Sequence, residues 1–210
     1  VVLNNGKTGA VTFIGTVSPA GGNLKEPVTE STKKAARCFY ALEQNRADQK
    51  RYPAVNPIDS YSKYLEYPEI REFLDEKIEK GWADMVAKAK NIIRQGRDAA
   101  EQINILGDDG VPMSYHETFW KSELLDFVFL QQDAFDAVDS LCPLERQKYM
   151  LNLILDICDR KFEFDNFEDC RNFFKEMIND LRQMNYTDFH SEDFEKYNSQ
   201  LSKLLEENGK

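Results

Sequence analysis

Apolar side chains recur with the period of an α-helix over most of the chain beyond residue 69. The first such stripe begins at Ile70, passes through Trp82 and continues to Ile103, a length of about nine helical turns. Further stripes predict helices over 117–141, 144–159, 167–184 and 194–205. A helix with one apolar face is stable only when that face packs against a neighbour, so the pattern predicts a helical bundle.

The first 65 residues have a different character, since they hold five of the ten glycines. β-Branched residues bounded by glycines predict a strand over 10–17, and a helical pattern follows over 29–44. The segment 52–58 carries two prolines and is expected to be an edge strand or an extended segment. The chain is therefore expected to be mainly α, with a short α/β part over 1–66 and a C-terminal helical domain over 67–210.

Composition narrows the classes of function. The formal net charge is −10, and an acidic chain repels phosphate backbones, so no nucleic-acid partner is expected. The four cysteines form no CxxC pair and only two histidines accompany them, which argues against a zinc site and a disulfide framework. No apolar run approaches the ~20 residues that cross a bilayer, so no direct membrane insertion is expected. The chain opens at Val1 rather than Met, which suggests a fragment or a processed product.

The tripeptide Gly6-Lys7-Thr8 invites comparison with a phosphate-binding loop. Such a loop needs a second glycine five positions before Gly6, where Val1 stands, and a helix whose N-terminal amides bind the phosphates. A β-rich segment follows here instead of a helix. The tripeptide is therefore expected to form a hairpin turn.

Asp108 and Asp109 are paired carboxylates in a glycine-flanked break between two long helical patterns. Paired carboxylates can perform acid–base chemistry when one pKa is raised. A loop between helices is solvated, however, and it projects from one end of a bundle. A surface contact is therefore the expected role of this pair.

Small polar residues stand where several helices are expected to begin. Thr29 or Ser31 is expected to cap the first helix, and Ser114 the helix that follows the Asp108 loop. Ser114 and His116 are close enough in sequence to suggest part of a catalytic triad, but no nucleophile elbow accompanies them. Capping is the expected role of Ser114, and likewise of Ser191 before the last helix.

Aromatic residues are numerous, and most lie on the helical stripes, where they are expected to be core. Tyr52 is different, because it lies between Arg51 and Pro53 at the start of an extended segment. A ring in that position is easily presented at a surface. Stacking on a ligand is the functional alternative to an ordinary structural role for Tyr52.

Three stretches together resemble a known family. Residues 51–63 read RYPAVNPIDSYSK, which is similar to the YPAVDPLDS signature of catalytic subunits of rotary ATPases. Residues 9–29 read GAVTFIGTVSPAGGNLKEPVT and resemble the VSPPGG…EPVT stretch of the catalytic A subunit of V-type ATPases. Residues 129–143 read FLQQDAFDAVDSLCP and resemble the FLQQ-AF segment of that subunit. The three stretches occur in the order that the family has.

The resemblance implies the C-terminal part of a rotary engine's A subunit, comprising the end of a nucleotide-binding α/β domain and a helical domain. In that family three A and three B subunits alternate around a central stalk, and ATP hydrolysis or synthesis is coupled to ion transport. The intact subunit would use ATP or ADP with Mg²⁺, whereas no bound cofactor is expected in this stretch alone, because the phosphate loop lies upstream in the family. The stretch is accordingly expected to be inactive by itself. Its location would be cytoplasmic, peripheral to the membrane.

The resemblance also carries roles to individual residues. Tyr52 matches the aromatic residue that stacks on adenine, and Phe129 and Phe135 match the segment whose aromatics close the other side of that pocket. Phe135 is the preferred choice of the two, with ordinary helix core as the alternative for both. Asp108 and Asp109 match a rotor-facing loop by position.

A different class of function stays open at this point. The chain is alternatively a stand-alone helical interaction module that binds protein partners through its acidic loops and has no nucleotide function. No catalytic residue and no metal ligand is expected under either hypothesis within these residues. The ion transported, H⁺ or Na⁺, is determined in the membrane sector under the first hypothesis.

Overall fold

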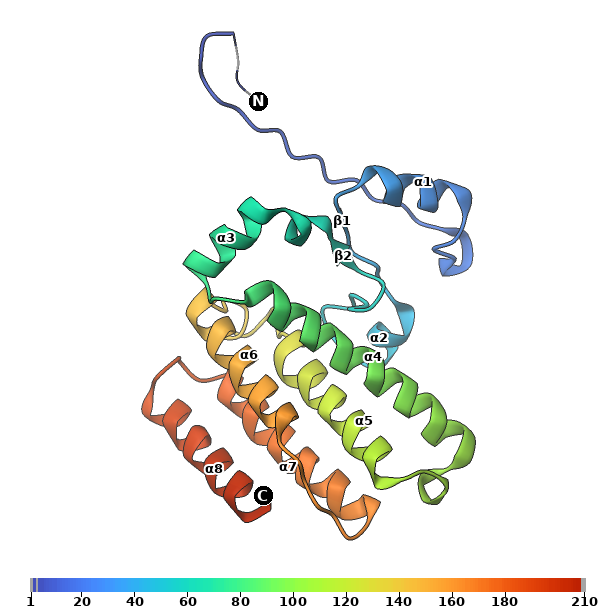
Figure 1. Cartoon of the computed structure of the whole chain (residues 1–210), viewed down its shortest axis with the longest axis vertical. Coiled ribbons are helices and arrows are strands. Elements are labelled where there is room, and N and C mark those ends of the chain that lie inside the picture. The colour runs from blue at the N-terminus through green and yellow to red at the C-terminus, as the bar shows by residue number, and fades with distance from the viewer. Residues whose placement is uncertain (1, 3, 209–210) are drawn as a thin grey trace. The chain divides into compact units, whose positions relative to one another are not determined.

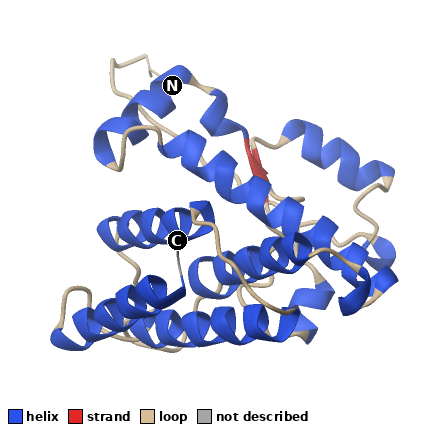
Figure 2. Ribbon diagram, turned by 60° about the horizontal axis from the view of Figure 1, so that its bottom comes forward, coloured by secondary structure: helices blue, strands red, loops and turns tan. Residues whose placement is uncertain are grey.

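The computed structural model describes residues 2 and 4–208 and divides into two compact units, Val1–Arg37 and Cys38–Lys210. Helices dominate, and the strands are short (Figure 2). Within the described part of the chain, no helix is long and apolar enough to cross a membrane. The expectation of a mainly α fold with a small α/β part is confirmed.

The first unit contains a turn around Gly6, a 3₁₀ turn η1 (Ala20–Gly22) and helix α1 (Pro27–Ala35). An antiparallel bridge between Val2 and Thr8 flanks Gly6, whose φ is +77°, so the hairpin-turn prediction is confirmed. The predicted strand over 10–17 is wrong, because that stretch forms no strand. Its side chains are exposed, including Phe13 at 90%. A strand is stable only where another strand satisfies its backbone groups, and none does so for this stretch in the described first unit.

Helix α1 begins two residues before the prediction and ends well before residue 44. Pro27 occupies its first turn, as its fixed φ favours, and Glu26 is the N-cap, so the capping role expected of Thr29 or Ser31 is wrong. Thr29 is instead buried in the first turn, where its hydroxyl donates to Oε1 of Glu26 at 3.1 Å. Beyond Ala35 the chain becomes extended, because the next residues pair in a strand.

The second unit opens with a two-stranded antiparallel ribbon of β1 (Cys38–Phe39) and β2 (Tyr61–Ser62), in the register Cys38 to Ser62. Between the strands lie helix α2 (Gln44–Asp48) and the segment that begins at Tyr52. This segment makes one isolated antiparallel bridge, between Val55 and Leu42, so it is extended as predicted without being a regular strand. The 3₁₀ turn η2 (Lys63–Glu66) follows.

The helical part of the second unit is built from six α-helices, some shorter than predicted. They are α3 (Pro68–Lys77), α4 (Trp82–Leu106), α5 (Met113–Leu125), α6 (Leu144–Asp159), α7 (Phe167–Asn185) and α8 (Glu192–Asn208). The long stripe predicted from residue 70 is interrupted at Gly81, whose φ of +83° does not fit a right-handed helix. The break predicted between α4 and α5 is confirmed and contains a 3₁₀ turn, η3 (Asp108–Gly110).

Helix α5 continues into a π-helical turn, η4 (Asp126–Leu130), and there it ends. The predicted helix over 117–141 is therefore wrong beyond Leu130. Residues 131–143 form a loop whose aspartates take up backbone amides that a helix would have needed. Ser114 lies inside the first turn of α5, with Pro112 at the N-cap, so its predicted capping role is wrong. Ser191 does accept from the amide of Phe194 at the start of α8, as predicted.

Helices α4–α5 and α7–α8 pack as antiparallel pairs, whereas α5 and α7 run in the same direction (Figure 1). Helices α4 and α5 lie side by side along their length, α5 packs on α7, and α8 covers α7 (Figure 1). The α4–α5 crossing is close because Gly96 faces Ser122, and a Cβ built on Gly96 would lie 2.0 Å from the Ser122 Cβ. Fully buried Leu124, Ile154 and Phe174 represent the core that these helices share. This core fixes the end of α5, next to which the candidate site lies.

Candidate functional site

Tyr52 presents its ring at the surface while its backbone is held. The side chain is 52% exposed, and its hydroxyl reaches the carbonyl of Ala47 only at 3.4 Å. The backbone carbonyl of Tyr52 accepts from the backbone N–H of Gln132 at 2.8 Å. This bond joins the Tyr52 segment to the loop after α5, so the structure brings together two of the stretches singled out in the sequence.

The loop over 131–143 is cross-linked by its own polar groups. The side chain of Gln132 donates to the carbonyl of Asp139 at 2.6 Å, and a carboxylate oxygen of Asp139 accepts from the amide of Asp133 at 2.6 Å. Asp133 in turn accepts from the amide of Phe135 at 2.9 Å, which forms an Asx turn. The Phe135 ring is fully exposed at 101%, so it packs on no other side chain in the described part of this unit.

Phe129 has a different environment from Phe135. It belongs to η4 and packs, partly buried, against the core cluster. The helix-core alternative therefore describes Phe129 and is wrong for Phe135. Tyr52 and Phe135 are both exposed, but the structure places no ring–ring contact between them. The segments that carry the two rings are joined, and the rings themselves are separate.

Four charged side chains meet around Arg51, the residue before Tyr52. Arg46 donates twice to Asp126, at 2.9 and 2.7 Å. Arg51 donates twice to Glu123, at 3.0 and 2.8 Å, and once to Asp126, at 2.6 Å. The guanidinium carbon of Arg51 also lies 4.4 Å from the centre of the Phe127 ring. We call Arg46, Arg51, Glu123 and Asp126 the charge cluster.

Burial and pairing act in opposite directions on Arg51. Burial alone would lower the pKa of its guanidinium, but hydrogen bonds and Coulomb attraction from Glu123 and Asp126 outweigh burial and raise that pKa. Sequence reasoning missed the cluster. The available signal was the spacing of Glu123 and Asp126, which places two acids on one face of a helix among apolar residues.

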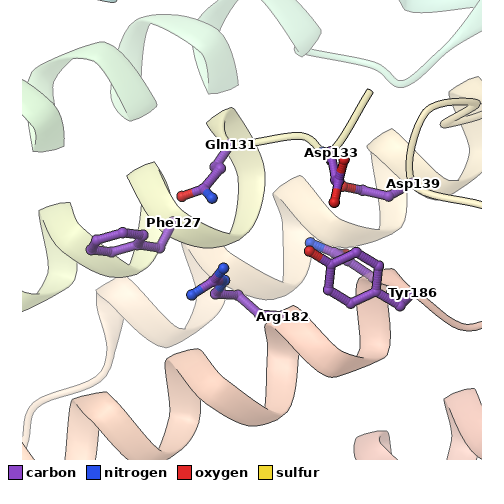
Figure 3. Close-up of a pocket in the computed structure, with 7 residues that line it drawn as sticks. Phe127, Gln131, Asp133, Asp139, Arg182 and Tyr186 are labelled. Carbon is purple, nitrogen blue, oxygen red and sulfur yellow. Dashed lines mark hydrogen bonds between the residues drawn. The ribbon is translucent and has the colours of Figure 1, made fainter. Parts of the chain in front are cut away.

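A small recess lies beside the cluster. Phe127 lines one side of it and Asp133 and Asp139 the other, with Arg182 between them (Figure 3). Burial raises the pKa of Asp139, against the lowering effect of its bond from Asp133 and of the charge on Arg146. The recess encloses about 220 Å³ including space open to solvent, which is below the volume of typical ligand pockets. It does not provide a nucleotide pocket by itself.

Asp108 and Asp109 lie in η3, at the end of the α4–α5 pair (Figure 1). Both side chains are exposed, whereas the backbone is anchored: a ring nitrogen of buried His116 lies 2.9 Å from the carbonyl of Asp108. The His116 ring stacks on Phe167, with centroids 5.5 Å apart. The loop is thus a fixed acidic projection. In the described residues, no group of three or more His, Cys, Asp and Glu side chains is arranged to hold a metal.

Comparison with known proteins gives matches to both parts of the chain. Residues 2–62 match the ATP synthase alpha/beta family, nucleotide-binding domain, and residues 71–181 match the C-terminal domain of V and A type ATP synthase. The "V-type ATP synthase alpha chain" of Chlamydia pneumoniae is 40% identical over 206 residues, which cover 98% of this chain and 34% of that protein. The same protein of Protochlamydia amoebophila is 37% identical over 207 residues. The chain spans about a third of the length of these curated relatives.

A solved structure supports the fold assignment. An ATP synthase subunit of Nanoarcheaum equitans, NeqB, superposes with a TM-score of 0.52 and 16% identity, over 69% of this chain and 33% of that one. At that identity the likeness concerns the fold alone. The family model over 71–181 matches more than half of the chain. This chain therefore belongs to the family of C-terminal domains of V and A type ATP synthases, preceded by a stretch of the ATP synthase alpha/beta nucleotide-binding family.

Proposed function

We propose that the chain is the C-terminal part of the catalytic A subunit of a V-type ATP synthase or ATPase, which couples ATP hydrolysis or synthesis to ion transport across a membrane. One observation carries the proposal: the backbone bond from Gln132 to Tyr52 joins the end of the nucleotide-binding stretch to the start of the loop after α5. Residues 1–66 would belong to the nucleotide-binding domain, and the helical domain over 67–210 would add the loop after α5 to the nucleotide site and transmit its closure.

In this proposal Tyr52 and Phe135 form the adenine-facing wall. Adenine has two flat faces, and each stacked ring contributes about 1–3 kcal/mol by analogy with bases on aromatic side chains. The exposure of both rings, complete for Phe135 and about half for Tyr52, supports this role, since an exposed ring face is available to a ligand. Phe129 would support the wall from the core side, because it packs inward from η4.

The phosphate and metal chemistry would belong to the rest of the subunit. The stretch Gly6-Lys7-Thr8 forms a turn followed by irregular backbone, so it lacks the helix on which phosphate loops depend. ATP or ADP with Mg²⁺ would therefore bind the intact subunit. The chain alone would hold neither and would be inactive.

The acidic loop that carries Asp108 and Asp109 would contact the central stalk. Asp108 and Asp109 project from the α4–α5 pair, and exposed carboxylates on an anchored loop suit a contact with basic side chains of a central stalk. Three copies of the A subunit would alternate with three B subunits around that stalk. The assembly would be cytoplasmic and peripheral to the membrane.

The test is reconstitution. The full-length A subunit that contains this chain, co-purified with its B subunit, should hydrolyse ATP in a Mg²⁺-dependent manner, and this chain alone should show no calorimetric ATP binding at micromolar concentration. A full-length complex that assembles but hydrolyses no nucleotide would overturn the proposal. Micromolar binding by this chain alone would overturn the assignment of the phosphate site to the rest of the subunit.

A further inference from the structure

The charge cluster is a neutral group of two guanidinium and two carboxylate groups removed from water. Arg46 and Asp126 are 8% and 6% exposed. The side chains of Arg51 and Glu123 are 17% and 15% exposed. The four groups come from two separate places in the sequence: the arginines lie between the two strands of the ribbon, and the carboxylates lie beyond helices α3 and α4.

Burying four charges is an expensive way to hold two segments together. The desolvation of buried ions offsets most of their mutual attraction, and apolar side chains of similar volume often stabilise a fold as well or better. Planar, bidentate pairs differ from apolar contacts in that they fix direction as well as distance. The geometry of the cluster therefore points to positioning as its role.

The arginines and the Tyr52 ring belong to one small structural unit. The backbone N–H of Arg51 donates to the carbonyl of Arg46 at 2.8 Å, and Lys50 between them has a φ of +58°, so the chain turns sharply there. The Tyr52 hydroxyl reaches back to Ala47. Because Arg51 precedes Tyr52 in this tight turn, the bonds that hold the Arg51 side chain also restrict where the backbone of Tyr52 can lie.

The carboxylates lie where α5 changes its winding. Glu123 is in the last turn of α5, and Asp126 is the first residue of η4. The carbonyl of Asp126 accepts from the N–H of Gln131 at 2.9 Å, and the next amide, that of Gln132, donates to Tyr52. Tyr52 and its neighbour Arg51 are thus fastened to both ends of η4, one by the backbone and the other by the side chain. Single π-helical turns of this kind are frequent at functional sites.

We infer that Arg51 is a positioning residue for nucleotide binding: its paired hydrogen bonds to Glu123 and its bond to Asp126 set the place of the Tyr52 ring against the base. The inference rests on the proposed function. Lysine cannot replace Arg51 in this role, because one ammonium group cannot make the paired bonds to Glu123 and also reach Asp126.

The experiment is a double-mutant cycle in the assembled complex, with KM for ATP and kcat measured for wild type, Arg51→Lys, Tyr52→Ala and the double variant. Arg51→Lys should raise KM roughly threefold or more, with kcat within about twofold. In the Tyr52→Ala background, Arg51→Lys should leave KM within about twofold of the value for Tyr52→Ala alone, since the ring that Arg51 positions is gone. Lys88→Ala, which removes an exposed ion pair with Asp159, is the matched control and should change neither constant.

The outcomes separate this inference from the proposed function. An equal rise of KM from Arg51→Lys with and without the Tyr52 ring would mean that Arg51 does not act through the ring. An unchanged KM for Arg51→Lys in the otherwise wild-type complex would overturn the inference as well. An unchanged KM for Tyr52→Ala alone would instead contradict the proposed function, in which the Tyr52 ring stacks on adenine. Where Arg51→Lys prevents assembly, Glu123→Gln tests the same bond from the acidic side, with the same expected pattern.

Discussion

The backbone N–H of Gln132 donates to the backbone carbonyl of Tyr52 across 2.8 Å, although 79 residues lie between them in the sequence. The charge cluster holds the same segment at a second point, through the side chain of Arg51, the residue before Tyr52. An exposed tyrosine ring is thereby held on a backbone that is fixed at two points.

Amide hydrogen exchange should single out Gln132 within its loop. Its N–H is held by Tyr52, whereas the structure gives no hydrogen bond to the N–H of Ala134 two residues later. We expect exchange at Gln132 to be slower by at least about tenfold, as measured by NMR on this chain. Equal rates at the two positions would show that the bond to Tyr52 does not persist in solution.

Removing one member of the charge cluster should destabilise the second unit strongly. Arg46→Met leaves Asp126 buried with Arg51 as its sole partner, and we expect a loss of about 3 kcal/mol in the free energy of unfolding, measured in urea. Adding Asp126→Leu removes the stranded charge and leaves the Arg51–Glu123 pair intact, so the double variant should recover part of the loss. A double variant less stable than Arg46→Met would contradict this account.

The close crossing of α4 and α5 should not accept a methyl group at Gly96. Alanine is favoured over glycine in a helix by about 1 kcal/mol, but its Cβ would lie 2.0 Å from the Ser122 Cβ. We expect the clash to dominate, so Gly96→Ala should destabilise the chain by about 1–3 kcal/mol in thermal or urea unfolding. Ser122→Gly should restore much of that loss in the Gly96→Ala background. If Gly96→Ala proves stabilising, the crossing is wider than the structure has it.

The four cysteines should divide by reactivity in the folded chain. Burial raises the pKa of Cys158 and of Cys170 to about 12, so at pH 8 only about one thiol in ten thousand is ionised. Only the thiolate reacts, so their labelling by iodoacetamide should be slow and should rise with pH up to that pKa. Partly exposed Cys38 should label first, as read by mass spectrometry, and all should label in urea. Fast native labelling of Cys170 would contradict its burial.

Helix boundaries could be predicted where both ends carried a local signal. The bounds of α6 match the sequence prediction because Pro143 precedes an uninterrupted apolar stripe. The stripe from residue 70 failed at Gly81, where periodicity continues across a residue whose φ is positive. The predicted strand over 10–17 failed for a non-local reason, since strand propensity has no effect without a neighbouring strand to pair with.

The candidate site could be predicted only in part. The resemblance singled out Tyr52, Phe129 and Phe135, and the structure adds that Tyr52 and Phe135 are exposed whereas Phe129 packs, partly buried, against the core. The joining of Tyr52 to Gln132 depends on the path of the chain between them, which no local pattern encodes. The charge cluster was not predicted for the same reason. Arginine and aspartate are usually exposed, and nothing local in the sequence indicates that Arg46 and Asp126 pair and are buried.

The stacking of Tyr52 on adenine is tested most directly by the KM for ATP of the full-length A subunit in complex with its B subunit, carrying Tyr52→Ala or Tyr52→Phe. The account predicts that Tyr52→Ala raises KM roughly tenfold with kcat nearly unchanged, because stacking on the base is lost while the phosphate chemistry stays intact. Tyr52→Phe should stay close to wild type, since the ring face remains and the hydroxyl makes only a 3.4 Å contact with Ala47. An unchanged KM for Tyr52→Ala in an active complex would contradict the account.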